Sequence, residues 1–227
     1  MGDTISQAIT WLNDPLNWTN PRGVFELLLQ HLWLSALAVV LGCAIAWPLG
    51  IWVGHTGRGG ALTVAVSNVT RAVPTLALLS LLPLTALGFG APSVVPALAV
   101  FAIPPLLATA YNGVRDTDPD ARDAAYGMGL SGAQVLWRVE LPLAVPQLAS
   151  GFRTASVQVV ATATLAALVN GGGLGLIISQ GFGLGMSVGG GQILAGGILV
   201  ALLALVIEGL LAVLEKLLTP RSLRPAR

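Results

Sequence analysis

The most constraining feature of this sequence is a set of three long stretches without any Asp, Glu, Lys or Arg. They cover residues 27–57, 72–114 and 154–207, which are 31, 43 and 54 residues long. A bilayer core about 30 Å thick needs roughly 20 apolar residues in a helix, so the first stretch suits one span and the other two suit two spans each. The sequence therefore predicts an all-α integral membrane protein with five transmembrane helices, at about 29–54, 62–84, 93–114, 143–169 and 192–214.

Composition excludes several other classes of protein. Apolar residues make up 55% of the chain and charged residues 9%, whereas soluble domains are about a quarter charged. Lys216 is the single lysine and follows Glu215, so no Gly-Lys-Ser/Thr phosphate loop is present. Cys43, His31 and His55 are isolated, so we expect no metal site, no catalytic residue and no cofactor bound by this chain.

The distribution of cations predicts the orientation, because short loops rich in Lys and Arg stay in the cytoplasm. With five spans, the first loop, the third loop and the C-terminus share one side, and they hold eight of the eleven cations. The N-terminus is then outside and the C-terminus in the cytoplasm. The expected organisation is an external or interfacial leader over 1–24, a transmembrane domain over 25–218 and a cytoplasmic tail over 219–227.

The sizeable polar segment between the third and fourth expected spans covers residues 115–141. Asp118 followed by Pro119 is typical of a helix start. Alanines and Met128 then recur at helical spacing and predict a narrow face of small side chains that a partner could approach closely. Glycines end this helix, Ser131 begins a second one with a capping box, and Leu141-Pro142 is expected to break it before the next span.

This segment resembles the permease subunits of binding-protein-dependent ABC importers. Their signature is Glu-Ala-Ala, three residues, Gly, nine residues, an aliphatic residue, any residue and Leu-Pro. The chain has Asp123-Ala124-Ala125, Gly129, Val139 and Leu141-Pro142 at the same spacing, with Asp for Glu and Val for Ile. The resemblance covers roughly residues 25–218 and implies a type I permease fold in the cell membrane.

The resemblance also implies partners and a coupling role. The segment would be a coupling helix that docks on an ABC ATPase dimer, which carries the ATP and Mg²⁺, and the chain itself would be a transport subunit and no enzyme. A second permease chain, identical or similar, and an external solute-binding protein would complete the importer. The residues expected to couple to the ATPase are Ala121, Asp123, Ala124, Ala125, Met128, Gly129, Leu141 and Pro142.

The cargo is indicated by a second stretch. Residues 153–167, followed by Gly172-Gly173-Leu174-Gly175, are similar to the branch that imports quaternary-amine osmoprotectants such as glycine betaine, carnitine and choline. A methionine, other amino-acid or oxyanion importer of the same architecture is the alternative. An intramembrane enzyme is a distant alternative, and a secondary transporter is a third one.

Few polar residues fall inside the expected spans. Arg71 and Arg153 are costly there unless paired, so we expect structural pairing, with Glu208 or Glu140, rather than contact with cargo. Hydroxyls on membrane helices often bond their own backbone, but a solute route also needs polar groups. The candidate residues for that route are Pro74, Thr75, Thr162, Thr164 and Asn170.

Overall fold

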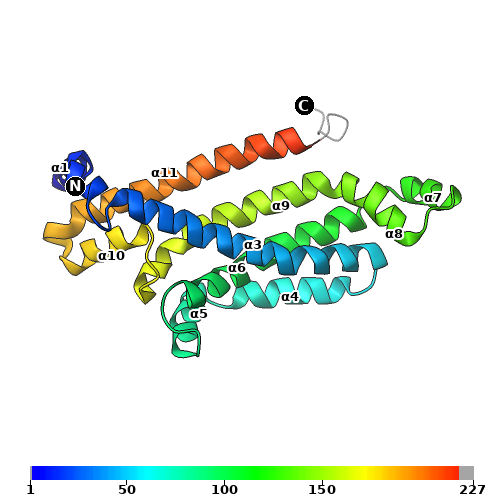
Figure 1. Cartoon of the computed structure of the whole chain (residues 1–227), viewed down its shortest axis with the longest axis horizontal. Coiled ribbons are helices and arrows are strands. Elements are labelled where there is room, and N and C mark those ends of the chain that lie inside the picture. The colour runs from blue at the N-terminus through cyan, green and yellow to red at the C-terminus, as the bar shows by residue number, and fades with distance from the viewer. Residues whose placement is uncertain (1, 220–227) are drawn as a thin grey trace. The chain divides into compact units, whose positions relative to one another are not determined.

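Helices joined by short turns make up the protein in the computed structural model, which describes residues 2–219 (Figure 1). The side chains at positions 2, 62, 64 and 71 lie outside the described part, as does most of the expected tail over 219–227. The described residues contain no β-strand. Their elements are α1 Gly2–Asn13, α2 Pro15–Thr19, α3 Val24–Thr56, α4 Gly60–Ala72, α5 Thr75–Leu81, η1 Leu82–Leu84, α6 Ala91–Arg115, α7 Pro119–Gly127, α8 Gly132–Val135, η2 Leu136–Glu140, α9 Leu141–Thr162, η3 Ala163–Val169, α10 Gly175–Gly183 and α11 Met186–Leu218.

Four of the five expected spans are helical stretches long and apolar enough to cross a membrane. Among the described residues these stretches are Pro15–Thr56, Ala91–Arg115, Gly132–Val169 and Met186–Leu218. The expected single helix over 62–84 is wrong, because the chain leaves the helix at Val73, which has φ −74° and ψ 121°, and restarts after Pro74. Proline lacks an N–H and restricts the residue before it, so α4 and α5 are separate helices.

The chain divides into two compact units, which we describe separately. Unit 1 comprises Met1–Val39, Pro74–Ala99 and Ser156–Ile207, and unit 2 comprises Val40–Val73, Val100–Ala155 and Glu208–Arg227. Each unit therefore gathers segments that are distant in sequence.

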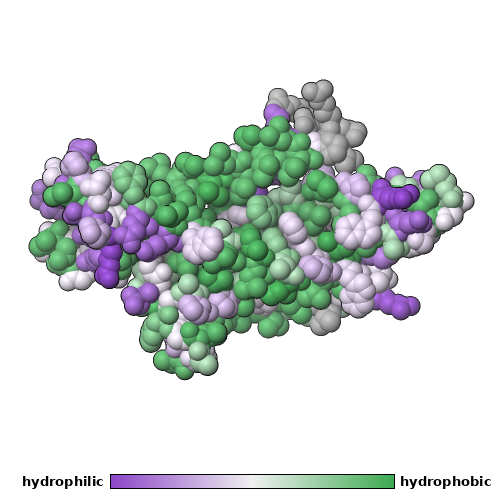
Figure 2. Space-filling view, in the orientation of Figure 1, coloured by the Kyte–Doolittle hydropathy of each residue, from purple (hydrophilic) through white to green (hydrophobic). Residues whose placement is uncertain are grey.

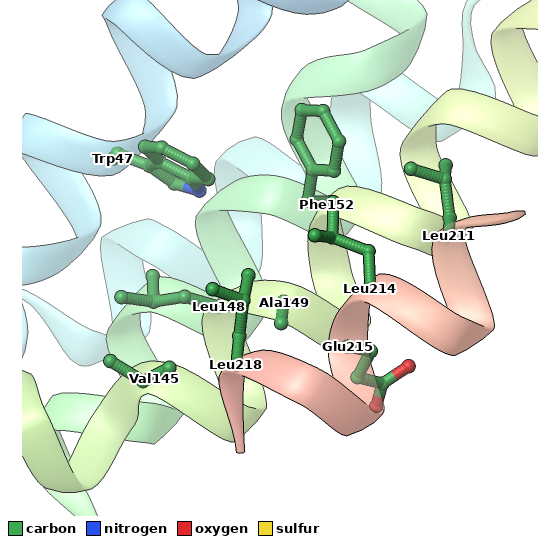
Figure 3. A pocket seen from close by; sticks show the side chains of 9 residues that line it. All are labelled: Trp47, Val145, Leu148, Ala149, Phe152, Leu211, Leu214, Glu215 and Leu218. Carbon is green, nitrogen blue, oxygen red and sulfur yellow. The ribbon is translucent and has the colours of Figure 1, made fainter.

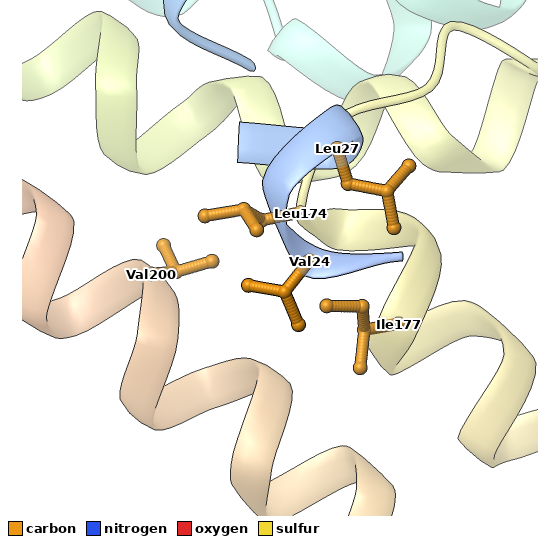
Figure 4. Close-up of a cluster of buried hydrophobic side chains, with 5 residues drawn as sticks. All are labelled: Val24, Leu27, Leu174, Ile177 and Val200. Carbon is orange, nitrogen blue, oxygen red and sulfur yellow. The ribbon is translucent and has the colours of Figure 1, made fainter. Parts of the chain in front are cut away.

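Unit 1 has an apolar core where α3, α10 and α11 meet (Figure 4). Five buried side chains from these helices and the preceding turn form it: Val24, Leu27, Leu174, Ile177 and Val200. Trp11 and Trp18 of the leader pack against this cluster. Trp18 also donates its Nε1–H to the Leu12 carbonyl at 2.7 Å, which helps hold α1 and α2 on the unit.

Unit 2 is packed through glycines, because a missing side chain lets helix backbones approach closely. A Cβ atom at Gly50 would lie 2.7 Å from that of Ala110, and one at Gly54 would lie 2.9 Å from that of Val114, so α3 lies directly against α6. On the other side of α6, a Cβ at Gly113 would lie 2.9 Å from that of Gln147 in α9. Gly50 and Gly54 therefore both pack against α6 within the chain.

The surface of unit 2 changes character along its helices. Hydrophobic residues cover the last turns of α11, whereas hydrophilic residues gather over α7 and α8 (Figure 2). Exposed leucines and a valine of α11 account for the apolar part: Leu210, Val213, Leu214, Leu217 and Leu218. Such a surface suits contact with lipid or with another membrane helix.

Candidate functional site: the polar segment between α6 and α9

The first helix of the polar segment, α7, begins and ends as the sequence predicts. The Asp118 side chain accepts a hydrogen bond from the Asp120 N–H at 2.9 Å, and Pro119 occupies the first helical position. At its end Gly129 has φ +84°, and the Leu130 N–H reaches back to the Ala125 carbonyl at 3.2 Å. This closing turn needs a left-handed residue, which explains a glycine at the motif position.

The second helix also begins as predicted, since the Ser131 N–H donates to Gln134 Oε1 at 2.8 Å. The expected break at Leu141-Pro142 is wrong. The chain stays helical, because α8 passes into a π-helical turn, Leu136–Glu140, and then into α9. In α9 Pro142 lies in the first turn, and the Leu141 N–H bonds the Leu136 carbonyl five residues back. The wide turn makes room for a ring that would clash in a regular α-helix.

The motif residues of α7 lie on two sides of the helix. Asp123, Ala124, Met128 and Gly129 are exposed, with Met128 at 75%. Ala125, expected on the same small face, is instead buried at 2%, and Ala121 is half-buried. The side of α7 that a partner can reach is therefore the exposed one. It carries Asp123 and Ala124, which are about 100° apart around the helix axis.

The two remaining motif residues lie where the polar segment joins α9. Leu141 is half-buried and Pro142 is exposed. Both are in the first turn of that helix, which continues without a break from α8 and the π turn.

Arg153 of α9 is paired, as expected, but with one more acid than the sequence indicated. Its Nε lies 3.4 Å from Glu208 Oε1, and its Nη1 lies 2.8 Å from Glu215 Oε2, both in α11. Sequence reasoning missed Glu215, although its position seven residues after Glu208 places the two acids on the same face of a helix. The side chain of Arg71 lies outside the described residues.

Glu140, the other acid considered for Arg153, has different partners. Its side chain is 2% exposed, and it forms an ion pair with Arg122 Nε at 2.9 Å and a hydrogen bond with His55 Nδ1 at 2.6 Å. The sequence predicted neither partner, and His55 is 85 residues away from Glu140. This contact joins α7, the end of α3 and the π turn.

The residues proposed for a solute route all fall in unit 1. Pro74 and Thr75 lie at the start of α5, whereas the others lie at the end of α9, in η3 and directly after it. The two regions meet, since α5 packs against η3. The Thr162 hydroxyl donates to the Gln158 carbonyl at 2.7 Å, and that of Thr164 to the Ala161 carbonyl at 2.6 Å. Asn170 is exposed and ends η3 with φ +58°. These hydroxyls are satisfied as donors but keep acceptor capacity.

His31, which is isolated in the sequence and was not expected to belong to a metal site, is a structural residue of unit 1. It is fully buried, its Nε2 lies 2.8 Å from the Val160 carbonyl, and its Nδ1 accepts the Leu174 N–H at 3.2 Å. The ring therefore joins α3 to α9 and to the glycine turn before α10. Among the described residues no group of three or more metal-ligating side chains occurs.

A cavity of about 390 Å³ lies between α3, α9 and α11 in unit 2 (Figure 3). Leucine, valine and alanine side chains line most of it, together with Trp47, Phe152 and Glu215. The Trp47 and Phe152 rings are 6.2 Å apart between centroids. Because the carboxylate of Glu215 is held by Arg153, this cavity offers no free charge to a polar solute.

The fold of this chain is shared with a chain of a solved membrane transporter. A chain of the MetNI methionine ABC transporter in inward-facing conformations has the same fold, with a TM-score of 0.76 and 23% identity over 92% of this chain and 100% of that one. The family described as binding-protein-dependent transport system inner membrane component matches residues 38–220, and this chain belongs to it. It is therefore a multi-pass membrane protein and a transport component.

Two curated relatives cover nearly the whole chain. The glycine betaine/carnitine/choline transport system permease protein OpuCB of Bacillus subtilis is 34% identical over 86% of this chain and 88% of its own length. The carnitine transport permease protein OpuCB of Listeria monocytogenes is 37% identical over 87% of this chain and 89% of its own length.

Proposed function

We propose that this chain is the membrane-spanning permease subunit of an ATP-driven importer of quaternary-amine osmoprotectants such as glycine betaine, carnitine and choline. The observation that carries this proposal is the exposed outer side of α7, formed by Ala124, Met128 and Gly129 within a segment that belongs to the permease family. Small side chains and a glycine turn suit close docking by a partner. The names of the relatives support the cargo.

In the proposed topology the chain crosses the membrane five times. The broken pair α4 and α5 forms the second crossing, and the N-terminus is external. Four stretches have the length and hydropathy for a span, and α4 and α5 together with η1 cover residues 60–84. The leader would then lie at the external surface and α7 in the cytoplasm, where the cations of the third loop also belong.

The proposed partners are two ABC ATPase subunits, which bind ATP and Mg²⁺, a second permease chain and an external solute-binding protein. Closure of the ATPase dimer would move α7, and α9 would carry that movement to the solute route. Thr75, Thr162, Thr164 and Asn170 are proposed to line the route, with Pro74 as the bend between its two helices. The chain itself performs no covalent chemistry in this proposal.

The cargo is tested by uptake of labelled glycine betaine into proteoliposomes that contain the complete importer and its binding protein. We expect uptake to need ATP and to be inhibited by unlabelled carnitine or choline but not by methionine. Inhibition by methionine alone would favour the alternative of a methionine importer. Uptake that persists without the ATPase would identify a secondary transporter and overturn the proposal.

The coupling surface is tested by Ala124→Glu, which places a charge on the exposed side of α7. The matched control is Ala133→Glu, an exposed alanine of α8 outside the family motif. We expect Ala124→Glu to reduce ATP-driven uptake about tenfold or more, in the range of hot-spot substitutions at interfaces. Equal uptake by the two variants would show that this side of α7 does not contact the ATPase.

A further inference from the structure

Glu140 is a buried carboxylate inside the polar segment, at the free position of the family motif between Val139 and Leu141. Its side chain is 2% exposed and lies at the end of the π turn, directly before Leu141. Burial of an ionised carboxylate is costly unless it is paired and hydrogen-bonded. A carboxylate in a surface loop would normally stay in water, so the partners of the buried Glu140 side chain indicate its role.

The two oxygens of Glu140 are occupied by side chains from two different helices. Oε1 pairs with Nε of Arg122, which is in α7, and Oε2 pairs with Nδ1 of His55, which is in the last turn of α3. Arg122 also donates through Nη2 to the carbonyls of Val114 and Arg115 at the end of α6. One carboxylate thus gathers α3, α6 and α7 around the start of α9.

The position of Arg122 on α7 separates this contact from the exposed side. At 100° per residue Ala124 lies about 160° around the helix from Arg122, and Met128 about 120°. Ala125 and Tyr126 flank Arg122 instead, and Ala125 is buried. A partner that holds the outer side of α7 would therefore leave the inner contact with Glu140 intact.

The covalent connections of α7 are short turns and cannot by themselves fix its direction. Residues 116–118 precede it, and Gly129 with its left-handed backbone follows it. Among the described residues, the buried side chain of Ala125 and the bonds of Arg122 connect α7 to the neighbouring helices.

We propose that Glu140 is a positioning residue: through Arg122 and His55 it makes α7 move as one body with the ends of α3, α6 and α9. This inference rests on the proposed function, because it assigns to the cluster of Glu140, Arg122 and His55 the task of carrying ATPase movement into the membrane. Loss of the cluster uncouples ATP hydrolysis from import, and α7 then tilts without moving α9.

The experiment measures molecules imported per ATP hydrolysed by the complete importer, with Glu140→Gln and Arg122→Gln as variants. The controls make the same chemical changes at exposed positions of the same segment, Asp116→Asn and Arg138→Gln. We expect both variants to copurify with the ATPase and to hydrolyse ATP, while import per ATP falls about tenfold, the upper range for residues that carry coupling. The controls keep the wild-type ratio.

The double variant Arg122→Gln/Glu140→Gln distinguishes a cluster from two independent defects. We expect its ratio to fall no further than that of the more affected single variant, because each single change leaves the other charge without its partner. If Glu140→Gln does not fold, Arg122→Gln carries the same test, since its side chain is 24% exposed.

The outcomes distinguish failure of the positioning role of Glu140 from failure of the proposed function. An unchanged ratio in Arg122→Gln, with import by the wild type intact, overturns the positioning role and leaves the proposed function standing. A wild-type complex that hydrolyses ATP without importing any quaternary amine overturns the proposed function and this inference together. Simple loss of folding would lower the amount of complex but not the import per ATP of the complex that remains.

Discussion

Arg153 in α9 lies with its Nη1 2.8 Å from Oε2 of Glu215 in α11, and this ion pair joins two helices that line a mostly apolar cavity. Glu208 approaches the same guanidinium at 3.4 Å from one oxygen. Glu215 is also one of the residues that line the cavity of unit 2 (Figure 3). A charge within an apolar helix is tolerated because it has a partner of opposite sign.

The two acids should contribute unequally to stability. We expect Glu215→Gln to lower the thermal stability of the purified protein, by up to about 1 kcal/mol, as is typical of partly exposed ion pairs. Glu208→Gln should cost less, since its oxygen is more distant and its side chain is 43% exposed against 23% for Glu215. Melting of both variants in detergent measures the difference, and an equal or larger effect of Glu208→Gln would contradict it.

Replacement of His31 should destabilise unit 1 strongly. His31→Leu leaves the Val160 carbonyl and the Leu174 N–H buried without their partner, at a cost of about 3 kcal/mol. The matched comparison is Gln30→Leu, which removes a 3.3 Å bond from the Gly173 N–H and an exposed 3.2 Å bond to Glu26 Oε1, and should cost less. Thermal melting of the two variants tests this order. A His31→Leu protein as stable as the wild type would show that water satisfies both groups.

Gly54 should not accept even one methyl group. Its Cβ would lie 2.8 Å from the Tyr111 carbonyl oxygen and 2.9 Å from Val114 Cβ, so Gly54→Ala has to push α3 away from α6. We expect a loss of about 1–3 kcal/mol, as for overpacked cores. Gly209→Ala is the control, because it faces open space in α11, where alanine favours the helix by about 1 kcal/mol. A stable Gly54→Ala protein would rule out this close helix contact.

Gly129 should be required because its backbone has a positive φ, and not because a side chain would clash at this position. Both Gly129 and Gly127 have nothing within 4 Å of a built Cβ, but only Gly129 of the two has a positive φ. Gly129→Ala should therefore loosen the end of α7 by about 1–2 kcal/mol, while Gly127→Ala should leave it unchanged. Hydrogen exchange of the α7 amides measures the change. Equal exchange in the two variants would show that the closing turn tolerates a side chain.

The sequence by itself indicated most of the helices, because the length of an uncharged stretch and its turn residues are local properties. It placed α7 to within a residue through Asp118, Pro119 and Gly129, and it identified the family through fixed spacing in the same segment. It failed at residue 73, where the restriction imposed by Pro74 outweighs a continuous apolar pattern.

The tertiary structure decided which charges meet. Arg153 was expected to be paired, but the choice of Glu215 beside Glu208 depends on the rotation and height of α11 against α9. In the same way Glu140 takes Arg122 and His55 as partners because three helix ends converge around it. Hydropathy and spacing describe a helix along its own axis, whereas an ion pair depends on how two helices approach each other, and that geometry is set only when the chain packs.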